Sequence, residues 1–85
     1  MILTGHALTK IKLLKKHGFD ISKNFLEKVI HNPEFTTHEK FGRKAAYQTI
    51  DEKLAIRVIY EERDDIIVVT VMIVRKERYE KDHLR

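Results

Sequence analysis

The hydrophobic period of this chain changes at Asn32-Pro33, and this change restricts the fold more than any other feature. Before these residues, apolar side chains recur every three or four positions, as on one face of a helix; after them, apolar and polar side chains alternate. Proline cannot continue a helix, and it disfavours helical geometry in the residue before it. A helical third followed by strands predicts an α+β fold.

Two helices are expected before Pro33. Thr4 is expected to cap the first helix, and Gly18 fits the left-handed position that follows a helix end. Ser22 is expected to cap the second helix, with Ile21 and Leu26 spaced as a hydrophobic staple around it.

Four strands are expected after the helices. Residues 34–41 form a polar edge candidate, whereas residues 43–50 and 54–61 alternate. Residues 66–74 are apolar on both faces, which is typical of a central strand that is covered on both sides. Short polar breaks make neighbouring strands antiparallel, so the sheet is expected to be a four-stranded antiparallel meander.

The expected architecture places both N-terminal helices on one face of this meander. Residues 75–85 are expected to form a short charged C-terminal tail or helix. The opposite face of the sheet has no helix to cover it, so the tail or a partner would have to do so. With 85 residues, the chain is expected to be a single domain with one core.

Composition excludes several classes of protein. The absence of cysteine rules out disulfides and thiolate zinc sites. The longest uncharged apolar run has nine residues, far fewer than the roughly 20 that a membrane-spanning helix needs. No signal peptide is recognised at the start, so we expect a cytoplasmic protein without membrane contact.

The positive charge is concentrated at the two ends of the sequence. The net charge is +4, and residues 1–33 alone carry six lysines against two acids. Residues 75–85 carry five bases against three acids, whereas residues 51–65 carry six acids against three bases. The basic ends are compatible with a polyanionic partner.

No metal site or cofactor is expected. The five histidines are scattered, and none shows the His-x-x-x-His spacing of a helical metal site. The chain has no phosphate-binding loop, no dinucleotide fingerprint and no Gly-x-Ser-x-Gly motif.

Three residues are candidates for chemistry, and each has two interpretations. His6 and Lys10 share a helix face, which is either a solvated basic surface or a site in which His6 transfers protons or contacts phosphate. Arg57, in the middle of a strand, either pairs with an acid on a neighbouring strand or clamps a phosphate. Thr70 is either a tolerated strand threonine or a catalytic hydroxyl.

Basic residues crowd the end of the last predicted strand around one aromatic ring. Arg75, Lys76, Arg78 and Tyr79 fit a contact with single-stranded nucleic acid, in which the ring stacks on a base. The alternative is a charged tail that keeps the protein soluble.

Six short motifs, taken together, resemble a known group of proteins. They are His6-Ala7 with a basic residue four after the histidine, Lys15-Lys16-His17-Gly18, Asn32-Pro33, Ile56–Tyr60, Ile67–Val71, and Arg75 followed by Arg78-Tyr79. In this order they cover nearly the whole chain. They resemble small uncharacterised domains near the RelE/ParE-like toxin superfamily, and BrnT-type toxins are similar in the Lys-His-Gly turn and the basic-Tyr ending.

The resemblance implies two helices on a small antiparallel sheet and a toxin whose partner is a small acidic antitoxin protein. Better-known relatives cut messenger RNA on the ribosome, whereas the ParE branch inhibits DNA gyrase. Carried over to this chain, it implies His6, Arg57 and Tyr79 as catalytic residues of a metal-free ribonuclease. It implies nucleic-acid contacts at Lys10, Thr70, Arg75 and Arg78, and the basic cluster at the end of the last strand adds Lys76 to them.

Two positions depart from the pattern of the group. Position 10 is lysine where arginine is typical, and position 72 is methionine where an aromatic residue is common. Three functions therefore stay open at this stage: a ribonuclease toxin or a degenerate relative, a non-catalytic protein- or nucleic-acid-binding module, and a gyrase-directed toxin. The oligomeric state also stays open, a homodimer included.

Overall fold

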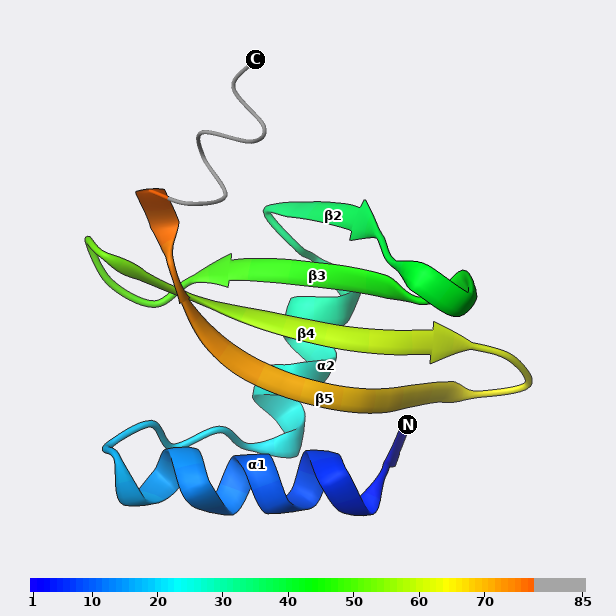
Figure 1. Ribbon diagram of the computed structural model, residues 1–85, viewed down its shortest axis with the longest axis horizontal. Coiled ribbons are helices and arrows are strands. Elements are labelled where there is room, and N and C mark those ends of the chain that lie inside the picture. The colour runs from blue at the N-terminus through cyan, green and yellow to red at the C-terminus, as the bar shows by residue number, and fades with distance from the viewer. Residues whose placement is uncertain (78–85) are drawn as a thin grey trace.

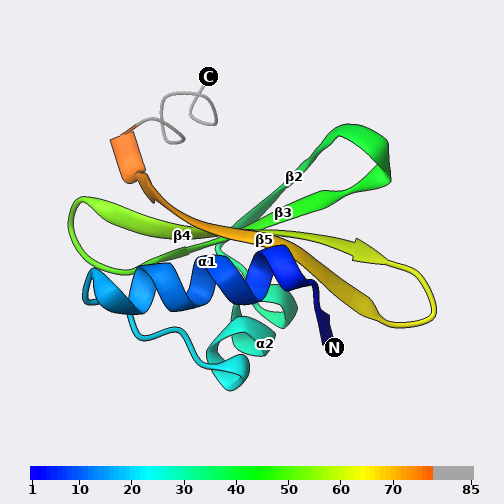
Figure 2. The same ribbon diagram turned by 60° about the horizontal axis from the view of Figure 1, so that its bottom comes forward.

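The structure is a computed structural model, and it describes residues 1–77. Two helices lie on one face of a five-stranded sheet (Figures 1 and 2). The helices are α1 (Gly5–Lys16) and α2 (Lys23–His31). The strands are β1 (Ile2–Leu3), β2 (Phe35–His38), β3 (Lys44–Thr49), β4 (Leu54–Glu62) and β5 (Ile66–Arg75), and a 3-10 turn, η1 (Lys40–Gly42), joins β2 to β3.

The predicted α+β class is confirmed, but the predicted four-stranded antiparallel sheet is wrong. Strands β2 to β5 form the expected antiparallel meander, and β1 adds a fifth strand that runs parallel to β5. The strand order is β1-β5-β4-β3-β2. Strand β1 has only two residues, which is too short for any hydrophobic period, so no local pattern could reveal it.

Strand β5 is also not the central strand of the sheet, because β4 occupies the middle position and β5 borders only β4 and the short β1. Its apolar pattern has another cause. Ile59 and Tyr60 of β4 pair with Thr70 and Val68, so Val69 is an extra residue in β5. Such a bulge moves the alternation by one position. The β5 side chains in the helix-facing core are Ile66 and Val68 before the bulge, and Val71 and Ile73 after it.

The predicted helix ends are confirmed. The Thr4 hydroxyl accepts a hydrogen bond from the Ala7 amide at 3.1 Å and donates one to the Val69 carbonyl at 2.9 Å. Ser22 caps α2 by accepting from the Phe25 amide at 3.1 Å. Gly18 follows α1 with φ +91°, a conformation that glycine adopts without steric cost. Thr4 therefore joins the start of α1 to β5.

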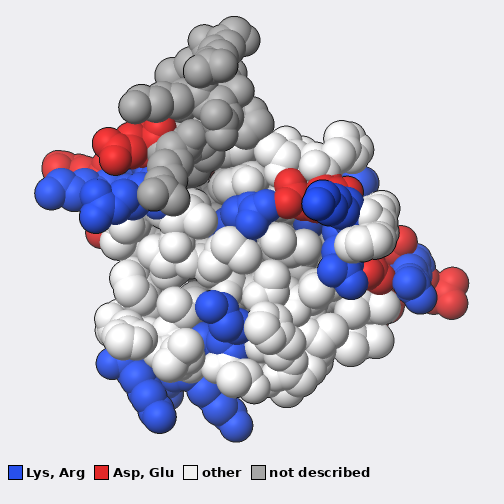
Figure 3. Space-filling model, in the orientation of Figure 1, with Lys and Arg blue, Asp and Glu red and all other residues white. Residues whose placement is uncertain are grey.

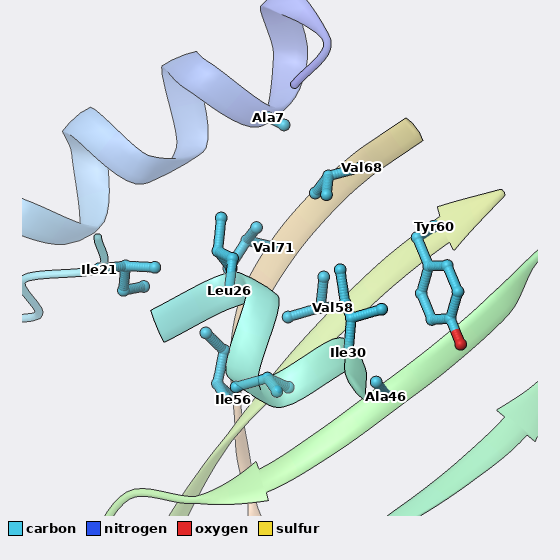
Figure 4. Close-up of a cluster of buried hydrophobic side chains, with 11 residues drawn as sticks. Ala7, Ile21, Leu26, Ile30, Ala46, Ile56, Val58, Tyr60, Val68 and Val71 are labelled. Atoms are coloured by element: carbon cyan, nitrogen blue, oxygen red, sulfur yellow. The ribbon is translucent and has the colours of Figure 1, made fainter. Parts of the chain in front are cut away.

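The main core lies between the helices and the sheet (Figure 4). Helix α2 contributes Leu26, Val29 and Ile30, which are nearly or fully buried, and α1 contributes Ala7. The sheet contributes Ala46, Ile56, Val58, Tyr60, Val68 and Val71. A second, smaller cluster of Ala45, Tyr47 and Ala55 lies on the opposite face, which we call the outer face.

Within residues 1–77, neither helix is long and apolar enough to cross a membrane. The predicted extra helix or tail over residues 75–85 lies mostly outside the described residues, which end at Glu77.

The first prediction concerns Thr4. Thr4→Ala removes both the helix cap and the hydrogen bond to β5, and we expect the free energy of unfolding to fall by about 2 kcal/mol. Ser22→Ala removes a cap alone and is expected to cost about 1 kcal/mol. Urea unfolding measures both changes, and Thr4→Ser should retain most of the stability. Equal losses for the two alanine variants would contradict the double role of Thr4.

Candidate nucleic-acid interface

The exposed side of α1 carries four lysines: Lys10, Lys12, Lys15 and Lys16. Ala7, Ile11 and Leu14 face the core, and most of the other positions of the helix are exposed. Lys12, Lys15 and Lys16 are exposed, and Lys10 is half-buried. Within residues 1–77, none of these side chains makes an ion pair or hydrogen bond. Basic side chains project along the edge where α1 lies (Figure 3).

His6 stands at the start of this surface. It is exposed in the first turn of α1, one helical turn before Lys10, so the two side chains are neighbours about 6 Å apart along the axis. His17 ends the helix as its C-cap. His6 and Lys10 therefore lie on the same face of α1, as predicted. This face forms one flank of the surface made by Lys10, Lys12, Lys15 and Lys16, which we call the lysine-rich surface.

Arg57 has a different environment, on the outer face in the middle of β4. Its Nε donates to the Tyr47 hydroxyl at 2.8 Å, and its Nη1 donates to Met72 Sδ at 3.3 Å. Its Nη2 forms an ion pair with Glu39. The side chain of Arg57 is 22% exposed and that of Glu39 is 24% exposed. Arg57 is therefore paired with an acid, but this acid lies in the β2–β3 connection and not, as expected, on a strand next to β4.

Glu39 was not recognised from the sequence, although it determines what Arg57 can do. It follows β2 and opens the connection to β3, and its carboxylate also accepts from the Thr37 hydroxyl at 2.9 Å. A phosphate would have to displace this carboxylate before it could bind the guanidinium of Arg57. A basic residue within an alternating strand predicts that some acidic side chain pairs with it, but the pattern does not identify that residue.

Tyr47 supports the same arrangement. Its ring stacks on Phe35 with centroids 4.3 Å apart, and the Arg57 guanidinium lies 5.9 Å from its centre. These contacts make a row across β2, β3, β4 and β5, because Phe35 pairs with Tyr47, Tyr47 with Arg57, and Arg57 with Met72. The guanidinium is therefore held by its neighbours on both sides.

The structure does not bring His6 and Arg57 together. Helix α1 packs on the helix-facing core with Val68 and Val71, whereas Arg57 lies beside Tyr47 on the outer face. Thr70 is half-buried and pairs with Ile59, a member of the outer cluster. The sheet therefore separates the predicted proton-transfer group from the predicted phosphate clamp.

The other predicted contacts lie at the far end of β5. Arg75 is exposed, and it lines a cavity of about 460 Å³ with Asp51, Glu52, Lys53 and Leu54. Two acids and two bases surround this cavity, so it has no charge excess for an anion. The Lys76 amide donates to the Lys53 carbonyl at 2.9 Å. Arg78 and Tyr79 lie outside the described residues.

One exposed aromatic residue was missed by sequence reasoning. Phe41, in the turn between β2 and β3, is 86% exposed and has φ +63°. Its only sequence signal is a large apolar side chain in a polar segment beside Gly42. Next to it, Arg43 donates to Glu61 at 2.8 Å, and this hydrogen bond lowers the pKa of Glu61 below its ordinary 4.5.

Among residues 1–77, no group of three or more histidines, aspartates or glutamates lies close enough to hold a metal ion. Comparison with protein-family models, with curated proteins and with solved structures gives no match to this chain. The relationship to the RelE/ParE-like toxins therefore stays a prediction that depends on the sequence motifs.

The second prediction concerns the Arg57–Glu39 pair. Arg57→Leu leaves the carboxylate of Glu39 without its partner, and we expect the free energy of unfolding to fall by about 2 kcal/mol. This value is below that of a fully buried pair, because solvent still reaches both groups. In the Arg57→Leu/Glu39→Leu double variant, unfolding by urea should show a smaller loss than the sum of the two single losses. Additive losses would mean that the pair is not coupled.

Proposed function

We propose that this chain is the toxin component of a toxin–antitoxin pair and that it binds RNA through the exposed side of α1. One observation carries the RNA contact: the four lysines of α1 have no acidic partner in the described chain. In contrast, four cations of the sheet and its turns are already in ion pairs; they are Arg43, Lys44, Arg57 and Arg63. Phosphates can therefore bind α1 without displacing a carboxylate.

The dimensions of α1 suit a nucleic acid. Its 12 residues span about 18 Å at about 1.5 Å per residue. One strand of a duplex rises about 3.4 Å per nucleotide, so the helix is about as long as five phosphates. The assignment to the toxin class comes from the resemblance of the motifs, which begin with His6-Ala7 on this same helix.

The proposed chemistry is metal-free cleavage of RNA. The 2′-hydroxyl attacks the adjacent phosphate, the bond to the 5′-oxygen breaks, and the products are a 2′,3′-cyclic phosphate and a 5′-hydroxyl. In this scheme His6 transfers the proton, and Lys10 one turn away offsets the charge on the phosphate. Arg57 takes no part in the reaction, because it is on the other face of the sheet and is bound to Glu39.

A second candidate is a non-catalytic binding module, a degenerate toxin that retains only its partner contacts. The separation of His6 from Arg57 favours it, because these two members of the catalytic set that the resemblance implies do not share a surface. Both candidates use the lysines of α1 for binding, and they differ in whether RNA is cut.

The third prediction tests the RNA contact. Lys12→Gln/Lys16→Gln should weaken binding to a single-stranded oligouridylate. It should reduce the slope of log K against log salt by about 1.4, since each phosphate contact contributes about 0.7. Fluorescence anisotropy over a range of salt concentrations measures this slope. Lys53→Gln, an exposed lysine in the β3–β4 turn, is the matched control. An unchanged slope in the double variant would remove α1 as the interface.

The fourth prediction separates the two candidates. If the chain is a ribonuclease, its induction should arrest growth, and the purified protein should cut RNA in the presence of a chelator. His6→Ala should then lower the cleavage rate by about 10²- to 10⁴-fold, the usual contribution of a proton-transfer group.

His6→Gln and Thr9→Ala serve as controls, because the first keeps a polar side chain and the second changes an exposed position of the same helix. Binding without cleavage by the wild type would support the non-catalytic module. Growth arrest with DNA-damage signalling and intact RNA would instead support a gyrase-directed toxin. Rescue by a small acidic protein encoded next to this chain would identify the antitoxin.

A further inference from the structure

Histidines stand at both ends of α1, on one flank of the lysine-rich surface. His6 lies in the first turn of the helix and His17 is its C-cap residue, and both side chains are exposed. His17 follows His6 by eleven positions, which is about three helical turns and about 17 Å along the axis. The two side chains therefore leave the helix in nearly the same direction, with Lys10 and Leu13 between them on that flank.

This flank has no acidic side chain in the sequence around it. Residues 1–19 contain neither aspartate nor glutamate, and Asp20, two positions after Gly18, is the first acid of the chain. Among residues 1–77, neither of the two imidazoles forms a hydrogen bond or an ion pair. On α1 a protonated histidine would thus have only cationic neighbours, and an anion to pair with it would have to come from a ligand.

The elements that pack against α1 supply no acid to these histidines either. Strand β1 has no titratable side chain, and the one titratable side chain of β5 is Arg75, its last residue. The N-terminal ammonium of Met1, just before β1, is paired with Asp65 at 3.1 Å. In the described connection from α1 to α2, Asp20 forms no ion pair with His17. The two histidines are therefore the groups through which pH changes the charge of this surface.

The other two histidines of the described chain have different surroundings. His31 ends α2 one helical turn after Glu27, and His38 ends β2 beside Glu39. Strand β2 is at the opposite edge of the sheet from β1, whereas α1 packs against β1 and β5. These two histidines gain charge on protonation without extending the lysine-rich surface, so they offer a matched comparison.

We propose that His6 and His17 bind RNA phosphates as imidazolium ions, so that RNA binding by α1 strengthens as the pH falls; this rests on the RNA contact proposed above. Lysine stays charged through neutral pH, whereas histidine changes its charge between about pH 5 and 8. Protonation adds two cations to the four lysines of the helix. Each cation that contacts a phosphate releases counterions, so the affinity and its salt dependence rise together.

Binding and cleavage then depend on pH in different ways. If His6 takes the proton of the 2′-hydroxyl, it must be neutral before the reaction, whereas binding gains from its protonated form. Binding is therefore best measured with a 2′-O-methyl oligouridylate, which has phosphates but no free 2′-hydroxyl to attack them.

Fluorescence anisotropy with this oligonucleotide, at several salt concentrations, tests the proposal. From about pH 8 to about pH 5.5 the wild type should bind more tightly. Its slope of log K against log salt should become steeper by about 1.4, since each of two new phosphate contacts contributes about 0.7. His6→Gln/His17→Gln should lose this change. His31→Gln/His38→Gln, the matched control, should retain it.

A variant with permanent charges gives an independent result. His6→Lys/His17→Lys should have the steeper slope already at about pH 8 and should keep it at about pH 5.5. Circular dichroism at both pH values checks that each variant is folded. A wild type whose binding does not change with pH, or a pH dependence that persists in His6→Gln/His17→Gln, would overturn the proposal.

The Lys12→Gln/Lys16→Gln variant separates this proposal from the RNA contact itself. If it lowers the salt slope while the wild type shows no pH dependence, α1 binds RNA and only the role of the histidines is wrong. If the wild type does not bind the oligonucleotide at any pH, both the RNA contact and the role of the histidines are wrong.

Discussion

The hydrogen bonds of Thr4 to β5 hold together parts of the chain that are more than 60 residues apart. Its amide donates to the Val68 carbonyl, and its hydroxyl donates to the Val69 carbonyl. The same hydroxyl caps α1, so one residue fixes both the start of the helix and its position on the sheet. Joining ends so distant in sequence costs loop-closure entropy, which the packing of Ala7 on the core helps to offset. The orientation of the lysine-rich surface depends on this connection.

On the outer face of the sheet, the positive side chains are bound to acids of the protein itself. Arg57 is neutralised by Glu39, and Arg43 by Glu61, so the positive charge of this side is used within the protein. On α1 the positive charge is not used in this way within the described chain. The net charge of +4 therefore does not show how much the two sides differ: the cations named on the outer face are paired with acids, whereas the lysines of α1 are not. A cation is available for a ligand only when its local acids have other partners or are absent.

Features that depend on neighbouring residues could be predicted from the sequence. The caps at Thr4 and Ser22 and the left-handed Gly18 each depend on a few adjacent positions, and all three are confirmed. The pairing of β1 with β5 depends on residues at opposite ends of the chain, and no local pattern records it. The bulge at Val69 hid the alternation of β5, so the strand was predicted to be central.

For the candidate site, the sequence supplied the residues but only part of their arrangement. Arg57 and the helix-facing residues of β4 lie on opposite faces of the sheet, as the alternation of residues 54–61 implies. It could not predict that Glu39 would reach Arg57, because that contact depends on the path of the β2–β3 connection. The left-handed backbone of Phe41 was equally hidden, since a bulky aromatic residue gives no local signal for it.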